Sequence, residues 1–167
     1  GFGGKFFALA QHLERLNDNL NKVSIDPPYS SKEWEELLAT LSEKNGNSDL
    51  SFYIQVTRGV AERNHFFPMD CEPTVFVMCT NLKSSSNPLI KSCITRSDNR
   101  WGRCDIKTTS LLPNLMLKNE ALLSDAFEVI LLKNGMLTEG ASSNVFVVFK
   151  TAPGTKRQES SSLKSIP

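Results

Sequence analysis

Lys107 stands out among the charged residues because of its neighbours in the stretch RWGRCDIKTTSLLPN, residues 100–114. It lies between the apolar Ile106 and a run of hydroxyl residues, and the next charge along the chain is Lys118. A partly desolvated lysine amine is suited to covalent chemistry with a carbonyl carbon. The local sequence by itself favours the ordinary alternative, a strand-end lysine whose amine reaches water.

Four more charged or titratable residues lie in apolar or turn contexts and could act together with Lys107. Arg15 lies in a segment with helical spacing, and Glu139 lies in the stretch LTEGASSN. Arg63 and His65 stand just before a Phe-Phe-Pro sequence. Pyridoxal phosphate (PLP) chemistry needs a lysine for a Schiff base, an acid for the pyridine nitrogen, an arginine for the phosphate and further cations for the substrate carboxylate. Taken singly, each residue is more typical of a surface charge or a local cap.

The bulk composition fits a packed core and disfavours two classes of partner. Of the 167 residues, 40% are hydrophobic and 22% are charged, which is typical of a globular chain. A net charge of +1 gives no electrostatic reason to expect nucleic acid or a membrane surface as a partner. No apolar run approaches the ~20 residues that span a bilayer, and the first residues do not resemble a signal peptide.

The cysteines and histidines are too dispersed to indicate a metal site. The four cysteines are widely spaced and form no CxxC pair: Cys71, Cys79, Cys93 and Cys104. This pattern predicts neither a zinc site nor a disulfide scaffold, so a reduced, cytoplasmic protein is the simplest interpretation. No Gly-rich phosphate loop and no nucleophile elbow marks another chemistry.

The spacing of apolar residues predicts a mixture of helices and strands. Helices are expected over residues 9–23, 30–46 and 110–124, and the second opens with Ser30 and Glu33 at capping-box spacing. Strands are expected over 50–59, 73–80, 89–96 and 143–150, with a hairpin over 127–140 that turns at Asn134-Gly135. Antiparallel signals dominate. The sequence therefore predicts an α+β chain of two lobes, residues 1–82 and 90–167, joined by a polar loop over 83–89.

Four stretches of this sequence resemble the fold-type IV PLP enzymes, and within them the D-amino-acid aminotransferase branch. The resemblance covers most of residues 5–149 and rests on four stretches: FALAQHLERL, YIQVTRGVAERNHFFP, RWGRCDIKTTSLLPN and NGMLTEGASSNVFVV. The third and fourth stretches are specific to the superfamily. The Arg-x-His of the second stretch indicates the D-amino-acid branch.

The resemblance implies a role for each of the charged residues. Lys107 is similar to the Schiff-base lysine, which also moves the proton between the substrate Cα and the cofactor C4′. Glu139 is similar to the carboxylate that pairs with the pyridine nitrogen, and Arg15 to the arginine that binds the phosphate. Arg63 and His65 are similar to the pair that binds the substrate α-carboxylate. In the family this pair comes largely from the neighbouring subunit, so the resemblance also implies a homodimer.

The reaction that the resemblance implies is a transamination between small molecules. The amino group of a D-amino acid such as D-alanine would pass to a 2-oxo acid such as 2-oxoglutarate. Two same-fold alternatives are an aminodeoxychorismate lyase and a branched-chain aminotransferase, which carry different lysine motifs. A third alternative is a shortened, non-catalytic relative, because the family's first strands and its "GDGVYE"-like segment have no counterpart here.

The last residues contain two segments that resemble phosphate-binding segments of the family. PGTKR has Lys156 where a threonine is usual, and ESSSLKSIP offers hydroxyl groups. By this resemblance Thr155, Ser160 and Ser161 are phosphate contacts. A long helical stretch separates the two segments in the family, whereas here they nearly touch. The sequence is therefore either internally shortened or a set of joined pieces of a longer chain. The second is favoured, because lost helices would expose apolar faces.

Overall fold

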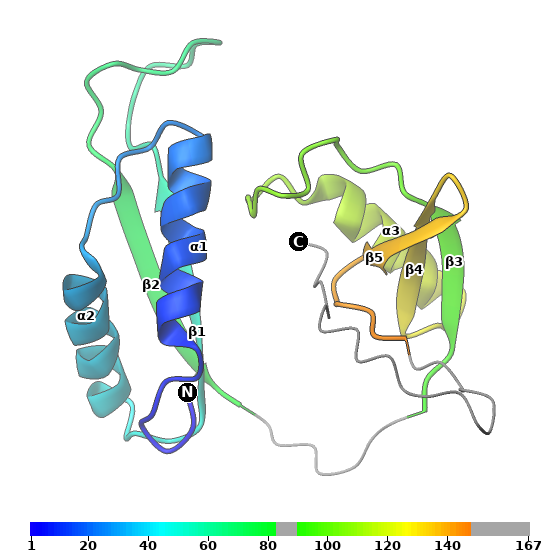
Figure 1. Cartoon of the computed structure of the whole chain (residues 1–167), viewed down its shortest axis with the longest axis horizontal. Coiled ribbons are helices and arrows are strands. Elements are labelled where there is room, and N and C mark those ends of the chain that lie inside the picture. The colour runs from blue at the N-terminus through cyan, green and yellow to red at the C-terminus, as the bar shows by residue number, and fades with distance from the viewer. Residues whose placement is uncertain (83–89, 148–167) are drawn as a thin grey trace, which may run out of the picture. The chain divides into compact units, whose positions relative to one another are not determined.

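The computed structural model describes residues 1–82 and 90–147, and the chain divides into two compact units, residues 1–86 and 87–167 (Figure 1). Both units combine helices with β-structure, as the α+β interpretation predicts. None of the helices in the described ranges is long and apolar enough to cross a membrane. The predicted phosphate contacts Thr155, Ser160 and Ser161 lie outside the described residues.

The first unit consists of two helices and a two-stranded sheet. These elements are α1 (Leu9–Lys22), α2 (Ser31–Lys44), β1 (Leu50–Thr57) and β2 (Thr74–Asn81). The strands are antiparallel, and their register runs from Leu50 opposite Asn81 to Thr57 opposite Thr74. Figure 1 shows α1 running along the sheet with α2 beside it. The buried apolar side chains of this unit are Leu13, Leu20, Trp34, Leu38 and Leu50.

The predicted capping box at the start of α2 is confirmed. The Ser30 backbone N–H donates to Glu33 Oε2 at 2.7 Å, and the Glu33 backbone N–H donates to Ser30 Oγ. These bonds satisfy amide groups that a helix leaves unpaired at its first turn. The helix therefore begins where the sequence places it.

The second unit is a three-stranded sheet with one helix. Its elements are β3 (Cys93–Ser97), α3 (Leu112–Leu123), β4 (Glu128–Lys133) and β5 (Met136–Gly140), and the strand order is β3-β4-β5. The core consists of five buried side chains with Ile94 and Ala126 packed against them: Leu117, Ala121, Val129, Leu131 and Ala141. This core lies between α3 and the sheet, so it fixes the ends of β3 and β5 relative to each other.

The predicted hairpin turn in the second unit is confirmed, but one strand pair is parallel although antiparallel signals dominate the sequence, and one expected strand is wrong where the structure describes it. Asn134 and Gly135 both have positive φ, 52° and 76°, as a tight hairpin between β4 and β5 requires. β3 and β4 are parallel, because the chain between them returns through α3 rather than through a hairpin. The expected strand over 143–150 does not form over 143–147, and its last residues lie outside the described range.

Candidate active site

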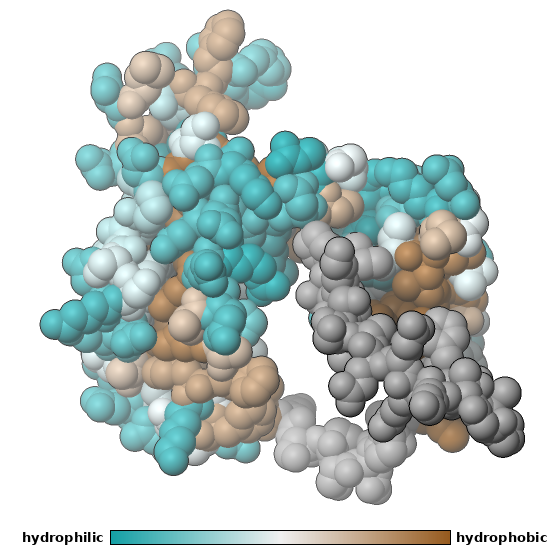
Figure 2. Space-filling model, viewed as in Figure 1, coloured by the Kyte–Doolittle hydropathy of each residue, from teal (hydrophilic) through white to brown (hydrophobic). Residues whose placement is uncertain are grey.

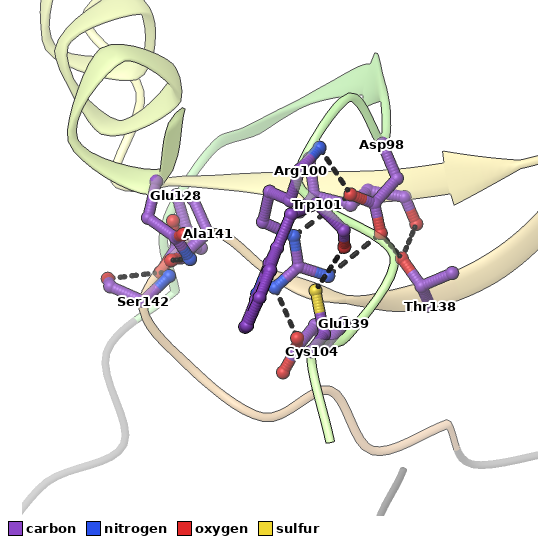
Figure 3. Close-up of polar contacts among 11 residues, drawn as sticks. Asp98, Arg100, Trp101, Cys104, Glu128, Thr138, Glu139, Ala141 and Ser142 are labelled. Atoms are coloured by element: carbon purple, nitrogen blue, oxygen red, sulfur yellow. Dashed lines mark hydrogen bonds and ion pairs between the residues drawn. The ribbon is translucent and has the colours of Figure 1, made fainter. Parts of the chain in front are cut away.

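An arginine held between two carboxylates is the centre of a polar site in the second unit. Arg100 donates to Asp98 twice, from Nε to Oδ1 at 2.9 Å and from Nη2 to Oδ2 at 2.8 Å. Its Nη1 donates to Glu139 Oε1. Asp98 directly follows β3 and Glu139 lies on β5, so the sheet brings the two carboxylates together. Figure 3 shows the guanidinium between them.

Burial makes this ion cluster strong. The side chains of Arg100 and Asp98 are only 6% and 8% exposed, and that of Glu139 is 19% exposed. The hydrogen bonds from Arg100 lower the pKa of Asp98 to about 2, although burial opposes the shift. Thr138 Oγ1 donates a further bond of 2.9 Å to Asp98. The pKa of Arg100 is raised, first by its hydrogen bond with Asp98. Arg100 is therefore a fixed cation that holds one oxygen of Glu139.

A small cavity of about 140 Å³ opens beside this cluster. Besides the cluster it is lined by Trp101, Gly102, Cys104 and Lys133. Its volume is below the roughly 300 Å³ at which ligand pockets usually begin, so it would form one wall of a larger site. Burial raises the pKa of the Cys104 thiol, which donates to the Trp101 carbonyl oxygen. Cys104 is thus a neutral wall residue rather than a nucleophile.

Glu128 anchors the turn that follows Glu139. Its Oε2 accepts from the hydroxyls of Ser142 at 2.7 Å and Ser143 at 2.9 Å, and the amine of Lys118 lies 3.3 Å away. A Cβ on Gly140 would lie 2.6 Å from the backbone oxygen of Ser143, so a larger residue would force the turn to move. Figure 3 shows the contact between Glu128 and Ser142. The end of β5 is therefore held in one conformation.

Glu128 should make the stability of the second unit depend on pH. Burial alone raises its pKa, but the hydrogen bonds, led by that of Ser142, outweigh burial and lower it from 4.5 to about 2. Because the folded-state pKa is below the unfolded value, the stabilisation is complete above pH 4.5 and is lost as the pH falls towards 2. The loss should be roughly 3 kcal/mol at most, at 1.36 kcal/mol per pKa unit. Urea unfolding at pH 7, 4 and 2.5 measures it.

Glu128→Gln, which removes the titrating carboxylate, tests this assignment. Its matched control is Glu120→Gln in the same unit. Glu120 forms an exposed ion pair with Arg96, with side chains 48% and 43% exposed, and such pairs contribute about 1 kcal/mol or less. Glu128→Gln should be much less stable than the native chain at pH 7 and should lose less stability on acidification. Equal acid sensitivity of the native chain and Glu128→Gln would show that Glu128 does not carry this dependence.

The residues singled out from the sequence are distributed over both units. Lys107 and Glu139 lie in the second unit, where Lys107 is exposed and sits in a loop after the buried Ile106. It is not at a strand end, so that part of the ordinary alternative is wrong, but its exposure agrees with an amine that reaches water rather than with a partly desolvated one. Arg63 and His65 lie in the exposed loop between β1 and β2 of the first unit.

Arg15 is exposed on α1, also in the first unit. Its Nη2 lies 3.3 Å from His12 Nδ1, one turn earlier on the helix. The side chain therefore has a local partner, and its charge faces solvent. Across residues 1–82 and 90–147, no group of three or more metal-ligating side chains gathers.

Asp98, Arg100 and Glu128 were missed by reasoning from the sequence. Asp98 and Arg100 are two residues apart, directly after a strand and close to Lys107. Glu128 is the single charge at the start of the apolar run FEVILL. A charge beside a predicted buried strand is a signal that could have drawn attention to them.

The sequence was compared with models of protein families and with curated proteins. The family model for amino-transferase class IV matches residues 2–161. A D-alanine aminotransferase from Bacillus licheniformis is 39% identical over 150 residues, which are 87% of this chain and 52% of that protein. The chain thus spans about half the length of the curated relatives it matches.

Solved structures share the fold at low sequence identity. A proposed 4-amino-4-deoxychorismate lyase from Legionella pneumophila superposes with a TM-score of 0.71 at 16% identity, over 84% of this chain and 53% of that one. A PLP-bound branched-chain amino acid aminotransferase from Thermobaculum terrenum gives a TM-score of 0.69 at 13% identity, over 81% of this chain and 46% of that one. At these identities the likeness establishes the fold alone.

Proposed function

The chain belongs to the class IV aminotransferases, and from that premise we propose that the complete gene product is a PLP-dependent transaminase of D-amino acids. Its amino donor would be D-alanine or a similar D-amino acid, and its acceptor a 2-oxo acid such as 2-oxoglutarate. The observation that carries the proposal is Glu139, a carboxylate fixed by Arg100 beside a cavity. The 39% identity to a D-alanine aminotransferase supports the substrate class.

The residues around Glu139 fit the pyridine ring of PLP. Arg100 occupies Oε1 of Glu139, and within the described residues Oε2 accepts no hydrogen bond. A fixed anion with one free oxygen can pair with a protonated ring nitrogen and keep the proton on it. When bound, PLP supplies an electron sink for charge that develops at the substrate Cα. Glu139 would maintain that sink, and Arg100 would keep Glu139 in place.

Lys107 would act as both attachment point and proton carrier. Lys107 is exposed, so a carbonyl group can approach its amine from solvent. As a base it would remove the proton from the substrate Cα, and as an acid it would return that proton to C4′ of the cofactor. The neighbouring Ile106 is buried, with 6% exposure, and this fixes the backbone from which Lys107 projects.

The first unit would supply the anion-binding groups. Arg15 would bind the cofactor phosphate, because its guanidinium faces solvent and carries several donors. Arg63 and His65 would bind the substrate α-carboxylate, supplied to the active site of a second copy in a homodimer. The four cysteines are free thiols, which supports a reduced cytoplasmic setting for this chemistry.

Two other reactions on this fold remain alternatives to D-amino-acid transamination. The likeness to a proposed 4-amino-4-deoxychorismate lyase and to a branched-chain aminotransferase means that the fold does not choose the reaction. The Arg63-x-His65 pair is the sequence feature that favours D-amino acids. A shortened, non-catalytic relative is a further alternative, and intact mass spectrometry of the natural protein tests it. A mass close to that of these 167 residues would support shortening.

A panel of amino donors tests the proposed reaction directly. Coupled assays should show turnover of D-alanine with 2-oxoglutarate, and little turnover of L-leucine or aminodeoxychorismate. In the same assays, Arg63→Ala should raise the KM for D-alanine by roughly 10- to 150-fold. That range corresponds to about 1.5–3 kcal/mol for a hydrogen bond to a charged group. The physical reason is loss of a planar, paired donor for the carboxylate.

Arg63→Lys and Arg96→Ala are the controls for that experiment. Arg63→Lys keeps the charge without the paired donors, so it should recover only part of the affinity. Arg96 forms an exposed surface pair in the second unit, and Arg96→Ala should leave the KM unchanged. Activity confined to L-leucine or aminodeoxychorismate, or an unchanged KM in Arg63→Ala, would overturn the choice of D-amino acids.

A further inference from the structure

The loop that carries Arg63 and His65 is fastened at its base by Arg58. We call residues 58–73, between β1 and β2, the substrate loop. Arg58 Nη1 donates to the carbonyl oxygen of Ser24 at 2.7 Å, and Nη2 donates to that of Val23 at 2.5 Å. Val23 is the C-cap of α1, so the guanidinium satisfies carbonyl groups that the helix leaves unpaired. One side chain thus joins the loop to the end of the helix.

The same guanidinium also holds the far part of the loop. Its Cζ lies 3.8 Å from the centre of the Phe67 ring, which is a cation–π contact. Phe67 is 62% exposed, so packing against other residues does not by itself fix the position of its ring. Phe67 follows His65 by two residues, and the contact therefore restricts the backbone on which the histidine sits.

The two ends of the substrate loop are closed tightly against each other. Gly59 has φ +106°, and a Cβ there would lie 2.1 Å from the Glu72 carbonyl oxygen and 2.8 Å from Cys71 Sγ. Cys71 Sγ donates to the carbonyl oxygen of Val60 at 3.2 Å. The loop therefore leaves the sheet through a narrow base with a fixed geometry.

The side chains of Arg63 and His65 are held by no such contacts. Within the described residues, neither the Arg63 guanidinium nor the His65 ring forms a hydrogen bond or an ion pair; only the His65 backbone N–H is bonded, to Asn64 Oδ1. Figure 2 shows apolar side chains among the polar ones at the outer end of this loop. Where the two charged groups are presented is therefore set by the backbone of the loop, and so by its base.

We propose that Arg58 is a positioning residue that determines where the substrate loop presents Arg63 and His65 to the substrate carboxylate. The role of Arg63 and His65 in this inference rests on the proposed function, whereas the contacts of Arg58 with α1 and Phe67 do not depend on it. A guanidinium suits the task because it binds two carbonyl groups with its edge and the Phe67 ring with its face at the same time. A lysine has one nitrogen and cannot do both.

Arg58→Lys tests the proposal in the complete gene product. The KM for D-alanine should rise roughly tenfold, the size expected for one or two lost contacts to a charged group, while kcat stays nearly unchanged. In the Arg63→Ala background the same substitution should have almost no further effect on KM, because Arg58 acts through Arg63. Phe67→Leu, which keeps the contacts to α1, should raise KM less. Arg96→Lys is the control and should change nothing.

Hydrogen exchange of the loop amides gives a readout that does not depend on activity. Amides of residues 60–67 should exchange faster in Arg58→Lys than in the native protein, and those of β1 and β2 should not. An unchanged exchange rate in the loop, or a KM increase that simply adds to that of Arg63→Ala, would overturn the proposal. If Arg63→Ala alone leaves KM unchanged, the proposed function fails, and the exchange rates still decide whether Arg58 fastens the loop.

Discussion

Lys107→Ala will abolish transaminase activity and remove the visible absorption band of the complete gene product reconstituted with PLP. The substitution takes away both the amine that attaches the cofactor covalently and the group that moves the substrate proton. General acid–base catalysis alone is worth about 10²–10⁴-fold, so the total loss should reach at least about 10⁴-fold in kcat. Absorbance spectroscopy before and after borohydride reduction, together with the D-alanine assay, measures both effects.

Lys91→Ala is the matched control for Lys107→Ala. Lys91 is also an exposed lysine of the second unit, so its removal changes the net charge equally and should leave the band and the activity intact. The native protein should keep its cofactor through dialysis after borohydride treatment, whereas Lys107→Ala should release it. A native protein that stays colourless with added PLP would refute the PLP assignment. A band that persists in Lys107→Ala would mean that another amine is the attachment point.

Glu139→Gln should lower kcat by roughly 10²–10³-fold, comparable to the loss of one donor that stabilises charge in a transition state. A neutral amide cannot keep a proton on the pyridine nitrogen, so the electron sink weakens when negative charge develops at the substrate Cα. The KM for D-alanine should change little, because the carboxylate-binding pair is elsewhere in the chain. Steady-state kinetics with D-alanine and 2-oxoglutarate separates the two constants.

Two further variants make the test of Glu139 specific. Glu139→Asp keeps the charge on a shorter side chain and should recover part of kcat, whereas Glu120→Gln removes an exposed surface charge and should leave kcat unchanged. The fold should survive Glu139→Gln, because Arg100 retains both of its bonds to Asp98. A kcat of Glu139→Gln within a few-fold of the native value would exclude Glu139 as the partner of the ring nitrogen.

Local signals in the sequence were sufficient for most of the individual elements. The capping box at Ser30 and Glu33 and the turn at Asn134-Gly135 act over a few residues, and both form as predicted. The parallel pairing of β3 with β4 depends on the path of the whole connection through α3, which alternation of apolar residues does not encode. The strand expected from residue 143 onwards was wrong over 143–147. The hydroxyl of Ser143, its first residue, instead binds Glu128, a contact across fifteen residues that no local pattern encodes.

In the candidate site, too, residues within contiguous motifs could be identified from the sequence, whereas contacts between distant residues could not. Lys107 and Glu139 were identified through motifs that are contiguous in the sequence, and their roles stay predictions. Arg100 is 39 residues from Glu139, so no local pattern could have joined them, although Arg100 lies in the same motif as Lys107. The burial that makes their pairing strong becomes visible only when β3 and β5 lie in one sheet.

The narrow base of the substrate loop indicates how a library for altered substrate scope should be designed. At position 59 every side chain larger than hydrogen would collide with the Glu72 backbone, so randomising it would yield mostly misfolded variants. Arg58 and Cys71 belong to the same fastening and should be kept as well. Diversity is best concentrated in residues 60–62, Asn64 and Phe66, whose side chains are exposed, while Arg63 and His65 are kept as the proposed carboxylate-binding pair and both ends of the loop stay fixed. The base then serves as a constant frame into which new specificity loops can be grafted.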